Sequence, residues 1–393
     1  MAELNETPRG SRIHIAFFGL RNAGKSTLVN AFTGQQIAIV SDVPGTTTDP
    51  VSKAMEILPL GPCLITDTAG LDDVGELGTM RVEKTLKVLE KTDIAVWVWG
   101  EGLLNADSTD CHELFLTECQ KRGVVVIEYH RGDSVEELKK KIAAVKLEDS
   151  VPGLLDGLVE KGDRVVCVCP IDESAPKGRL ILPQVQVIRE CLDRHAICTV
   201  CQVDGLELLG GLERVKLVIT DSQAFREVAQ LLQTFQTSKS PGLTSFSVLF
   251  ARQKGDLAEF VKGLEAIKSL KDGDTVLVAE GCTHHRQCND IGSVKIPKAL
   301  AKLSGKKLKF EFASGSGFDL DCGGAPLVGE GVSNIRTFKH SNISLVVHCG
   351  GCMLTRREVL RRIALAKESG IPIVNYGLVL AMASGIEIEN LCI

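Results

Sequence analysis

The run Gly19-Leu20-Arg21-Asn22-Ala23-Gly24-Lys25-Ser26 decides how the first third of this chain folds. It has the form G-x-x-x-x-G-K-S, it follows an apolar stretch typical of a buried strand (12–18), and a helical pattern (27–32) comes directly after it. In that context the motif predicts a phosphate-binding loop, because its glycines let backbone N–H groups turn toward phosphate oxygens. Lys25 is expected to reach the β- and γ-phosphates, and Ser26 to hold Mg²⁺. The residues of this segment expected to contact nucleotide are Gly19, Asn22, Ala23, Gly24, Lys25, Ser26 and Thr27.

Two later stretches complete the pattern of a nucleotide hydrolase. Pro44-Gly45-Thr46-Thr47-Thr48-Asp49 has the composition of a first switch, in which Thr46 contacts nucleotide and Thr47 closes on Mg²⁺ and the γ-phosphate. Asp67-Thr68-Ala69-Gly70 follows another strand-like run and supplies an aspartate for Mg²⁺ and a glycine that senses the γ-phosphate. The predicted catalytic residues are Lys25, Thr47, Asp67 and Gly70.

These three motifs resemble the potassium-stimulated branch of the translation-factor-type GTPases. The resemblance implies that Asn22 helps to hold K⁺ beside the phosphates, where the ion takes the place of an arginine finger. Leu71 fits this interpretation, since leucine cannot orient a water molecule as glutamine would. The alternative for Asn22 is a loop residue that hydrogen-bonds its own backbone.

The segment expected to recognise the base is open to two interpretations. The GTPases of this class place Asn-Lys-x-Asp after their fifth strand, whereas the strand-like run 123–127 leads here into Glu128-Tyr129-His130-Arg131-Gly132-Asp133. Asp133 could pair with guanine, with His130 and Arg131 in place of Asn and Lys. Alternatively the motif is deleted, and this stretch is the later loop that enters a helix at 134–144; the short distance from Asp133 to that helix favours deletion.

Composition describes a globular protein of several domains. The chain has 393 residues, a net charge of −5 and a pI near 6.0, which argues against a general nucleic-acid binder. No apolar run approaches the roughly 20 residues that span a bilayer, so we expect no membrane association and a cytoplasmic location. The 14 cysteines then indicate buried thiols and a few metal ligands. Cys198 and Cys201 have no matching pair at zinc-finger distance, and we interpret them, like Cys167 and Cys169, as buried thiols.

The sequence predicts an α/β protein: a P-loop GTPase domain followed by two further α/β domains with largely parallel sheets. The predicted domains are 1–146 for the GTPase, 147–242 for a linking or self-association domain, and 243–393 for the last domain. In the last domain three strands end at Cys282, at the Cys349/Cys352 pair and at Asn375. The carboxyl ends of parallel strands meet at one edge, so these residues are expected to converge there.

Three thiolates with a nearby imidazole, from His284 or His348, could bind structural zinc or a [4Fe–4S] cluster, and ligand type does not separate the two. Val346-Val347-His348-Cys349-Gly350-Gly351-Cys352-Met353 is typical of such a site, because glycines let the backbone wrap closely around a metal centre.

The whole arrangement resembles the HydF family, GTPases that act as scaffold and carrier in [FeFe]-hydrogenase maturation. The resemblance covers nearly the entire chain and rests on the GTPase motifs and on five further segments: 175–183, 220–225, 282–285, 348–353 and 375–377. It implies a homodimer formed by the middle domain, and a [4Fe–4S] cluster bound by Cys282, Cys349 and Cys352, with His284 or His348 at a labile fourth position. It also implies a diiron precursor received from radical-SAM maturases and delivered to apo-hydrogenase. Two features depart from the family pattern: the altered base motif and a long segment, 313–334, which contains Cys322.

Two other functions remain open on the sequence. A ribosome- or tRNA-associated GTPase with structural zinc would have the same first domain and would bind RNA in a salt-dependent way. A redox enzyme would need four firm cluster ligands and a second cofactor site, and the sequence indicates neither.

Overall fold

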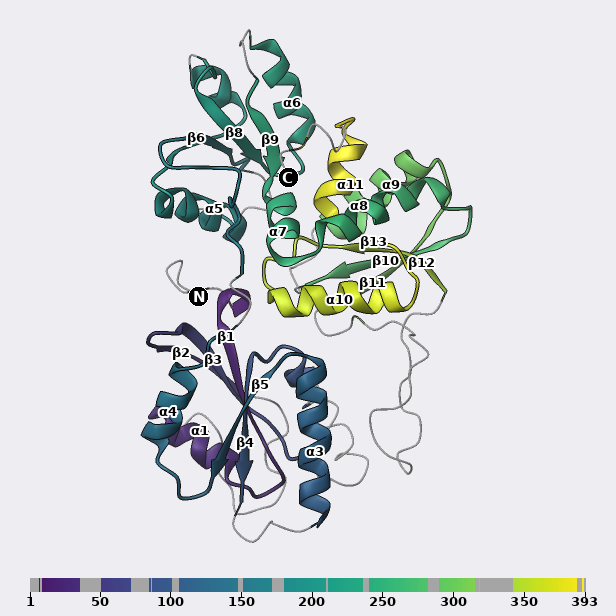
Figure 1. The fold of residues 1–393 in the computed structure, drawn as a ribbon. Helices are drawn as coiled ribbons and strands as arrows, with labels where there is room; N and C mark the ends of the chain where they lie inside the picture. Colours follow the sequence, from purple (N-terminus) through teal and green to yellow (C-terminus); the bar gives the residue numbers. More distant parts are fainter. Residues whose placement is uncertain are drawn as a thin grey trace. The chain divides into compact units, whose positions relative to one another are not determined.

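The structure is a computed structural model of the chain, which divides into two compact units, residues 1–150 and 151–393 (Figure 1). The residues that it describes are 7, 9–35, 51–71, 85, 87–100, 106–147, 151–171, 180–209, 211–235, 240–281, 290–314, 318, 342–386 and 391. The predicted site residues Thr46, Thr47, Cys282 and His284 therefore lie outside the described part, as does Cys322.

The first unit is a five-stranded sheet covered by helices on both faces. The strands are ordered β2-β3-β1-β4-β5, and only β2 among them runs antiparallel to its neighbour. The elements are η1 (Arg9–Ser11), β1 (Ile13–Phe18), α1 (Lys25–Thr33), β2 (Val51–Ile57), β3 (Gly61–Asp67), β4 (Ile94–Trp99), α3 (Ala106–Lys121), β5 (Val125–His130) and α4 (Val135–Ala143). Alternate side chains of β1 face opposite sides: Phe17 packs in the core with α1 and α4, and Phe18 packs against Phe115 of α3. Figure 1 shows α1 and α4 on one side of this sheet and α3 on the other.

The last helix of this unit follows the edge strand almost at once. Leu138 and Ile142 of α4 pack with Phe32 of α1, and Ser134 caps α4 by accepting a hydrogen bond from the N–H of Glu137. No further strand of the described sheet lies beyond β5. The described sheet of this unit therefore has β5 as its edge strand.

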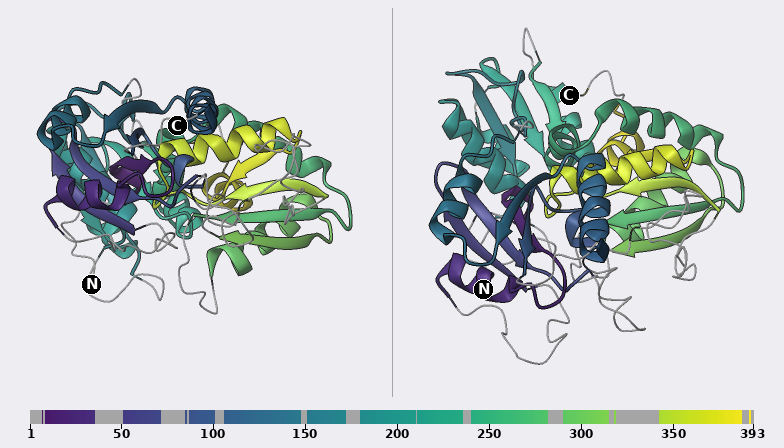
Figure 2. Two further views of the ribbon diagram at one scale, coloured as in Figure 1. Left: turned by 90° about the horizontal axis from the view of Figure 1, so that it is seen from below. Right: turned by 60° about the horizontal axis from the view of Figure 1, so that its bottom comes forward.

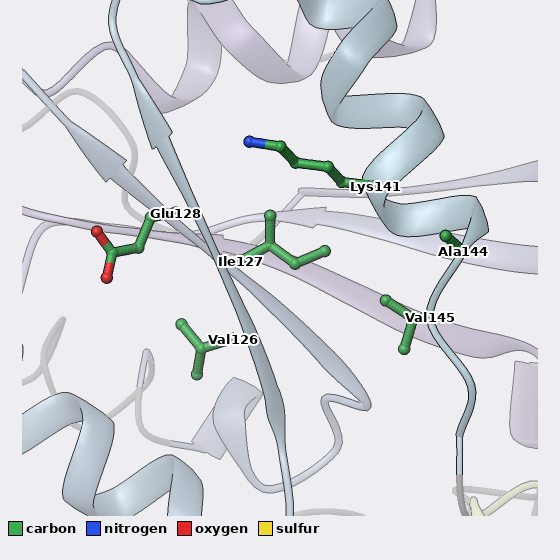
Figure 3. Close-up of a pocket in the computed structure, with 6 residues that line it drawn as sticks. All are labelled: Val126, Ile127, Glu128, Lys141, Ala144 and Val145. Carbon is green, nitrogen blue, oxygen red and sulfur yellow. The ribbon is translucent and has the colours of Figure 1, made fainter.

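A shallow pocket lies along the outer edge of this sheet, between β5 and the end of α4 (Figure 3). Ile127 points toward Lys141, whereas Glu128 points to the other side of the strand, where its carboxylate accepts a hydrogen bond from Trp99 Nε1 at 3.1 Å. None of the predicted site residues lines this pocket.

The second unit contains two four-stranded parallel sheets. The first has the order β7-β6-β8-β9 and the second β11-β10-β12-β13. The elements of the first are β6 (Arg164–Val168), α5 (Leu182–Asp193), β7 (Ile197–Cys201), η2 (Asp204–Leu209), β8 (Val215–Thr220), α6 (Phe225–Thr234) and β9 (Gly242–Ser245). Those of the second are α8 (Leu257–Ala266), η3 (Ile267–Ser269), β10 (Thr275–Glu280), η4 (Ile291–Lys295), α9 (Ile296–Ser304), β11 (Lys309–Ser314), β12 (Ile343–His348), α10 (Arg356–Glu368), β13 (Ile373–Asn375) and α11 (Tyr376–Ala383). In Figure 1, α10 lies along one face of the second sheet and α8, α9 and α11 along the other, and Figure 2 gives two further views.

Helix α7 (Phe246–Lys254) joins the two sheets and corrects one prediction from the sequence. The apolar run 244–250 was expected to be a strand, but the strand ends at Ser245, whose hydroxyl accepts a hydrogen bond from the N–H of Val248 at 3.2 Å and so caps a helix. The helix packs against α5 on one side and α10 and α11 on the other. One hydrophobic core therefore runs from Val218 of β8 to Val276 of β10, and the predicted border at 242/243 falls inside a compact unit. The α/β class with mostly parallel sheets is confirmed.

Candidate functional site

The phosphate-binding loop is shaped by two glycines with positive φ angles. Gly19 has φ +147°, and a Cβ atom there would lie 2.6 Å from the carbonyl oxygen of Val98, so no other residue fits without moving β4. Gly24 has φ +90° and directly precedes α1. Asn22 also adopts a left-handed conformation, φ +60°, which asparagine tolerates better than most residues. The sequence therefore forms the turn that aims backbone N–H groups at a phosphate.

Lys25 is buried inside this loop and is 7% exposed. Its Nζ donates hydrogen bonds to the carbonyl oxygens of Leu20 at 2.7 Å and of Gly19 at 3.2 Å. The ammonium group is therefore held at the centre of the loop, next to the backbone that would surround a phosphate.

Asp67 and Ser26, the two described residues expected to hold magnesium, are in direct contact. Ser26 Oγ donates to Asp67 Oδ2 at 2.6 Å, and the carboxylate is completely buried at the end of β3. Its other oxygen, Oδ1, has no hydrogen-bond partner among the described residues. Burial raises the pKa of Asp67, against the opposing effects of the Ser26 hydroxyl and the Lys25 charge. A buried carboxylate with an unsatisfied oxygen beside a serine hydroxyl fits a divalent cation with oxygen ligands.

The segment after Asp67 is fixed beside the loop. Thr68 Oγ1 donates to the carbonyl of Phe17 at 2.6 Å, and the N–H of Leu71 donates to the carbonyl of Gly19 at 3.3 Å. Gly70 is thus brought next to the first glycine of the motif, where a γ-phosphate sensor has to lie. Three of the four predicted catalytic residues, Lys25, Asp67 and Gly70, meet at the carboxyl ends of β1 and β3.

Asp133 takes part in a tight turn between β5 and α4. Its side chain is exposed, Oδ2 accepts a hydrogen bond from the N–H of His130 at 3.0 Å, and its carbonyl accepts one from the hydroxyl of Tyr129 at 2.8 Å. The carboxylate thus closes its own turn, as an aspartate in this position commonly does.

The cysteine site of the second unit lies where three parallel strands end. Ala279 of β10 is level with His348 of β12, and His348 is level with Asn375 of β13. Cys349 follows β12, and its Sγ accepts hydrogen bonds from the N–H groups of Gly281 at 3.1 Å and Gly351 at 3.4 Å. Such N–H groups stabilise a thiolate or a cluster-bound sulfur.

The predicted convergence is confirmed for the described residues. Asn375 Nδ2 donates to the carbonyl of Cys349 at 3.3 Å, and Gly281, whose N–H contacts the sulfur of Cys349, directly precedes Cys282 in the chain. The described part alone contains no group of three His, Cys, Asp or Glu side chains able to hold a metal ion; the third predicted cysteine lies outside it. Burial raises the pKa of the Cys349 thiol and raises that of Cys352 to about 11.

Lys254 is a residue of this site that sequence reasoning missed. It is the last residue of α7, its side chain is 3% exposed, and Nζ donates to three carbonyl oxygens of the segment 351–354. Burial lowers its pKa to about 8, against the opposing effect of the Cys352 and Cys349 thiols. Lysine is usually exposed, so no pattern in the sequence could have placed it here.

His348 is buried behind the cysteine loop. Nδ1 donates to the carbonyl of Cys349 at 2.7 Å, and Nε2 accepts from Arg362 Nη1 at 3.3 Å. Burial and the Arg362 charge lower the pKa of His348 to about 3, so the imidazole is neutral. Arg362, itself 1% exposed, also pairs with Glu358 at 3.0 Å. Both ring nitrogens are thus occupied by contacts that a bond to iron would have to break.

Of the four thiols predicted to be buried in the first sheet, Cys167 and Cys169 are buried, whereas Cys198 and Cys201 on the edge strand β7 are only partly buried. Cys167 and Cys169 face the same core, and Cys167 Sγ lies 3.7 Å from Cys198 Sγ. None of the ten cysteines that the structure describes is part of a disulfide bond.

The described loop, the buried Asp67 and the sheet order define the first unit as a P-loop GTPase domain. Comparison with known families supports this: residues 14–128 match the family model for a 50S ribosome-binding GTPase. Residues 154–255 match the hydrogen maturase F dimerization domain, and residues 258–390 match the hydrogen maturase F tetramerization domain. The chain belongs to the HydF family, the hydrogenase maturase GTPases.

The curated relatives match part of this chain. The chain is 28% identical over 138 residues to the tRNA modification GTPase MnmE of Bacteroides thetaiotaomicron, covering 35% of this chain and 29% of that protein. It is 42% identical over 108 residues to the GTPase Der of Wolinella succinogenes, covering 27% of this chain and 22% of that protein. The chain thus spans less than a third of the length of these two relatives.

Solved structures align loosely. A crystal structure of an Era variant from Aquifex aeolicus bound to GDP and AlF4⁻ covers 77% of this chain and 92% of that chain, with 15% identity and a TM-score of 0.26. A crystal structure of Toc33 from Arabidopsis thaliana with Mg²⁺ and GMPPNP covers 49% of this chain and 70% of that chain, with 15% identity and a TM-score of 0.24. No helix among the described residues is long and apolar enough to cross a bilayer.

Proposed function

We propose that this protein couples GTP hydrolysis in its first unit to the carriage of an iron–sulfur assembly in its second unit. A [4Fe–4S] cluster would be held by Cys282, Cys349 and Cys352, and its fourth iron would remain exchangeable. That iron would accept a diiron precursor from radical-SAM maturases and release it to apo-[FeFe]-hydrogenase. The oligomer would be at least a homodimer in the cytoplasm, a reducing compartment that suits the lack of disulfide bonds among the ten described cysteines.

The single observation that carries the proposal is the environment of Cys349. Its sulfur accepts two backbone N–H groups at the edge where β10, β12 and β13 end, and one of these groups belongs to the residue before Cys282. A site that supplies three thiolates leaves one iron of a cubane open to exchange, whereas four strong protein ligands would block it.

For the fourth position, the contacts of His348 favour His284. A ligand role for His348 would cost its bonds to Arg362 and to the Cys349 carbonyl. We assign His348 instead to holding the end of β12, and His284 to the labile iron.

In the first unit we propose that Lys25, Asp67, Gly70 and Thr47 perform hydrolysis, with Mg²⁺ bound by Ser26, Asp67 and Thr47. Asn22, which lies within the phosphate-binding loop with φ +60°, would hold K⁺. Gly19, Ala23, Gly24, Thr27 and Thr46 would complete the nucleotide contacts. Guanine recognition by Asp133 would require its carboxylate to leave the turn that it closes.

Anaerobic reconstitution with iron and sulfide tests the cluster proposal. Wild-type protein is expected to take up about four irons per chain, with an EPR signal after reduction that changes on addition of imidazole. Cys349→Ser and Cys282→Ser should lose the cluster and keep GTP turnover, whereas Cys201→Ser, a thiol of the other sheet, should retain both. Stoichiometric zinc without iron uptake would refute the proposal and favour a GTPase with a structural zinc domain.

A further inference from the structure

Lys254, the C-terminal residue of α7, contacts the cysteine loop, which we define as residues 349–354. Its Nζ donates to the carbonyl oxygens of Leu354 at 2.7 Å, Cys352 at 3.1 Å and Gly351 at 3.2 Å. An ammonium group has three donors, and three carbonyls of one short segment take them all. The loop itself turns at Gly351, φ +67°, and closes with a bond from the N–H of Leu354 to the carbonyl of Gly351 at 3.0 Å.

Through these hydrogen bonds Lys254 restrains the backbone that separates Cys349 from Cys352. The carbonyl oxygens of Gly351 and Cys352 both accept hydrogen bonds from Lys254 Nζ. The backbone of Cys352 therefore cannot rotate freely relative to that of Cys349. Nζ of Lys254 also lies 5.3 Å from the centre of the Phe250 ring on the same helix, and this cation–π contact helps to hold the ammonium group in place. A loop held in this way needs little rearrangement when its thiols bind metal, which lowers the entropic cost of binding.

Lys254 also brings a positive charge into the interior of the second unit. Burying an ammonium group is unfavourable unless an opposite charge or strong dipoles compensate it. Carbonyl dipoles compensate in part, and the nearby sulfurs of Cys349 and Cys352 supply negative charge once they are thiolates. A positive charge fixed beside a cluster favours its reduced, more negative state.

We propose that Lys254 is a positioning residue of the iron–sulfur site: it holds the cysteine loop in the ligand-binding conformation, and its fixed charge raises the reduction potential of the bound cluster. The inference rests on the proposed cluster function and adds the residue that tunes it.

The test compares three variants of the full chain. Lys254→Met removes donors and charge, Lys254→Gln keeps an N–H₂ group without the charge, and Lys254→Arg keeps the charge. The matched control is Arg252→Met, because Arg252 lies on the same helix but donates to the carbonyls of Leu154 and Asp156, away from the cysteine loop. The readouts are the rate at which a chelator removes iron and the midpoint potential from an EPR-monitored titration. GTP turnover serves as the folding control for the first unit, and far-UV circular dichroism of the apo protein, which reports both units, then shows whether the second unit is folded.

Lys254→Met should lose iron to the chelator about 10-fold faster than wild type, the usual effect of removing a residue that orients a metal ligand. Its potential, and that of Lys254→Gln, should be more negative than wild type, while Lys254→Arg and Arg252→Met should keep the wild-type potential. If Lys254→Met does not fold, the comparison of the Gln and Arg variants decides. Equal potentials in Gln, Arg and wild type would overturn the inference. Wild-type protein that binds no iron would instead overturn the proposed function.

Discussion

Replacing Arg362 by methionine should destabilise the second unit strongly, because it leaves a carboxylate without its cation in the core. Arg362 is 1% exposed and Glu358 is 4% exposed, and their ion pair measures 3.0 Å. Removing one partner of a buried pair costs about 3–5 kcal/mol, whereas an exposed pair contributes about 1 kcal/mol or less. With a urea m-value of about 2–3 kcal/mol/M, the unfolding midpoint should fall by about 1.5 M.

The chain offers an internal control for this experiment. Both tryptophans, Trp97 and Trp99, lie in β4 of the first unit, so their fluorescence reports that unit alone, while far-UV circular dichroism reports both. Arg362→Met should lower the midpoint of one circular-dichroism transition and leave the fluorescence transition unchanged. The double variant Glu358→Leu/Arg362→Met should recover most of the loss, because no buried charge is left unpaired. A loss below about 1 kcal/mol in the single variant, or strictly additive losses in the double, would refute the reasoning.

Four further outcomes are expected. Lys25→Ala should abolish GTP turnover, measured as phosphate release. The control Lys53→Ala, on the exposed face of β2, should keep it. Retained turnover in Lys25→Ala would exclude the loop as the active site. Replacing K⁺ by Na⁺ should slow turnover, and Asn22→Ala should remove the difference; equal rates in the two salts for wild type would contradict the role of Asn22. Burial raises the pKa of Asp67, so Mg²⁺ affinity should be fully present above that raised pKa and should weaken as the pH falls through it. The loss should occur at a higher pH than for an exposed aspartate. Calorimetry across pH would measure this loss, and a flat profile would speak against Asp67 as a ligand. The reduced cluster should show nitrogen hyperfine coupling that His284→Ala removes and His348→Gln keeps; the reverse result would make His348 the ligand.

Much of both sites could be predicted because their residues follow parallel strands. The phosphate loop after β1, Asp67 at the end of β3 and Cys349 after β12 were all found from an apolar run that ends in a chemically distinctive residue. The same reasoning misjudged α7, since a continuous apolar run does not distinguish a buried strand from a buried helix. The deciding signal was local: the hydroxyl of Ser245 caps the helix and ends the strand.

The burial of two cationic side chains could not be predicted from sequence patterns. Lys254 and Arg362 are charged residues on helices, and the default expectation for such residues is exposure to water. Their burial depends on contacts between distant segments: Lys254 lies 97 residues before Gly351, and Arg362 meets His348 from another element. For Arg362 a weak local signal exists, because Glu358 precedes it by one helical turn, next to the core residues Val359 and Ile363.

The phosphate-binding loop of the first unit and the cysteine loop of the second unit share a physical arrangement. In each, parallel strands deliver a glycine-containing loop to the carboxyl edge of a sheet, and a buried lysine donates to carbonyls of that loop: Lys25 to residues 19 and 20, Lys254 to residues 351, 352 and 354. The difference lies in what each lysine can reach. Lys25 begins the helix that follows its own loop, so its ammonium group can exchange carbonyls for phosphate oxygens as nucleotide binds. Lys254 belongs to a helix that packs between two sheets and contacts a loop distant in sequence, so its ammonium group is held in place by an element outside that loop. A mobile cation suits a site that turns over its ligand, and a fixed cation would suit the retained cluster that we propose for the second unit.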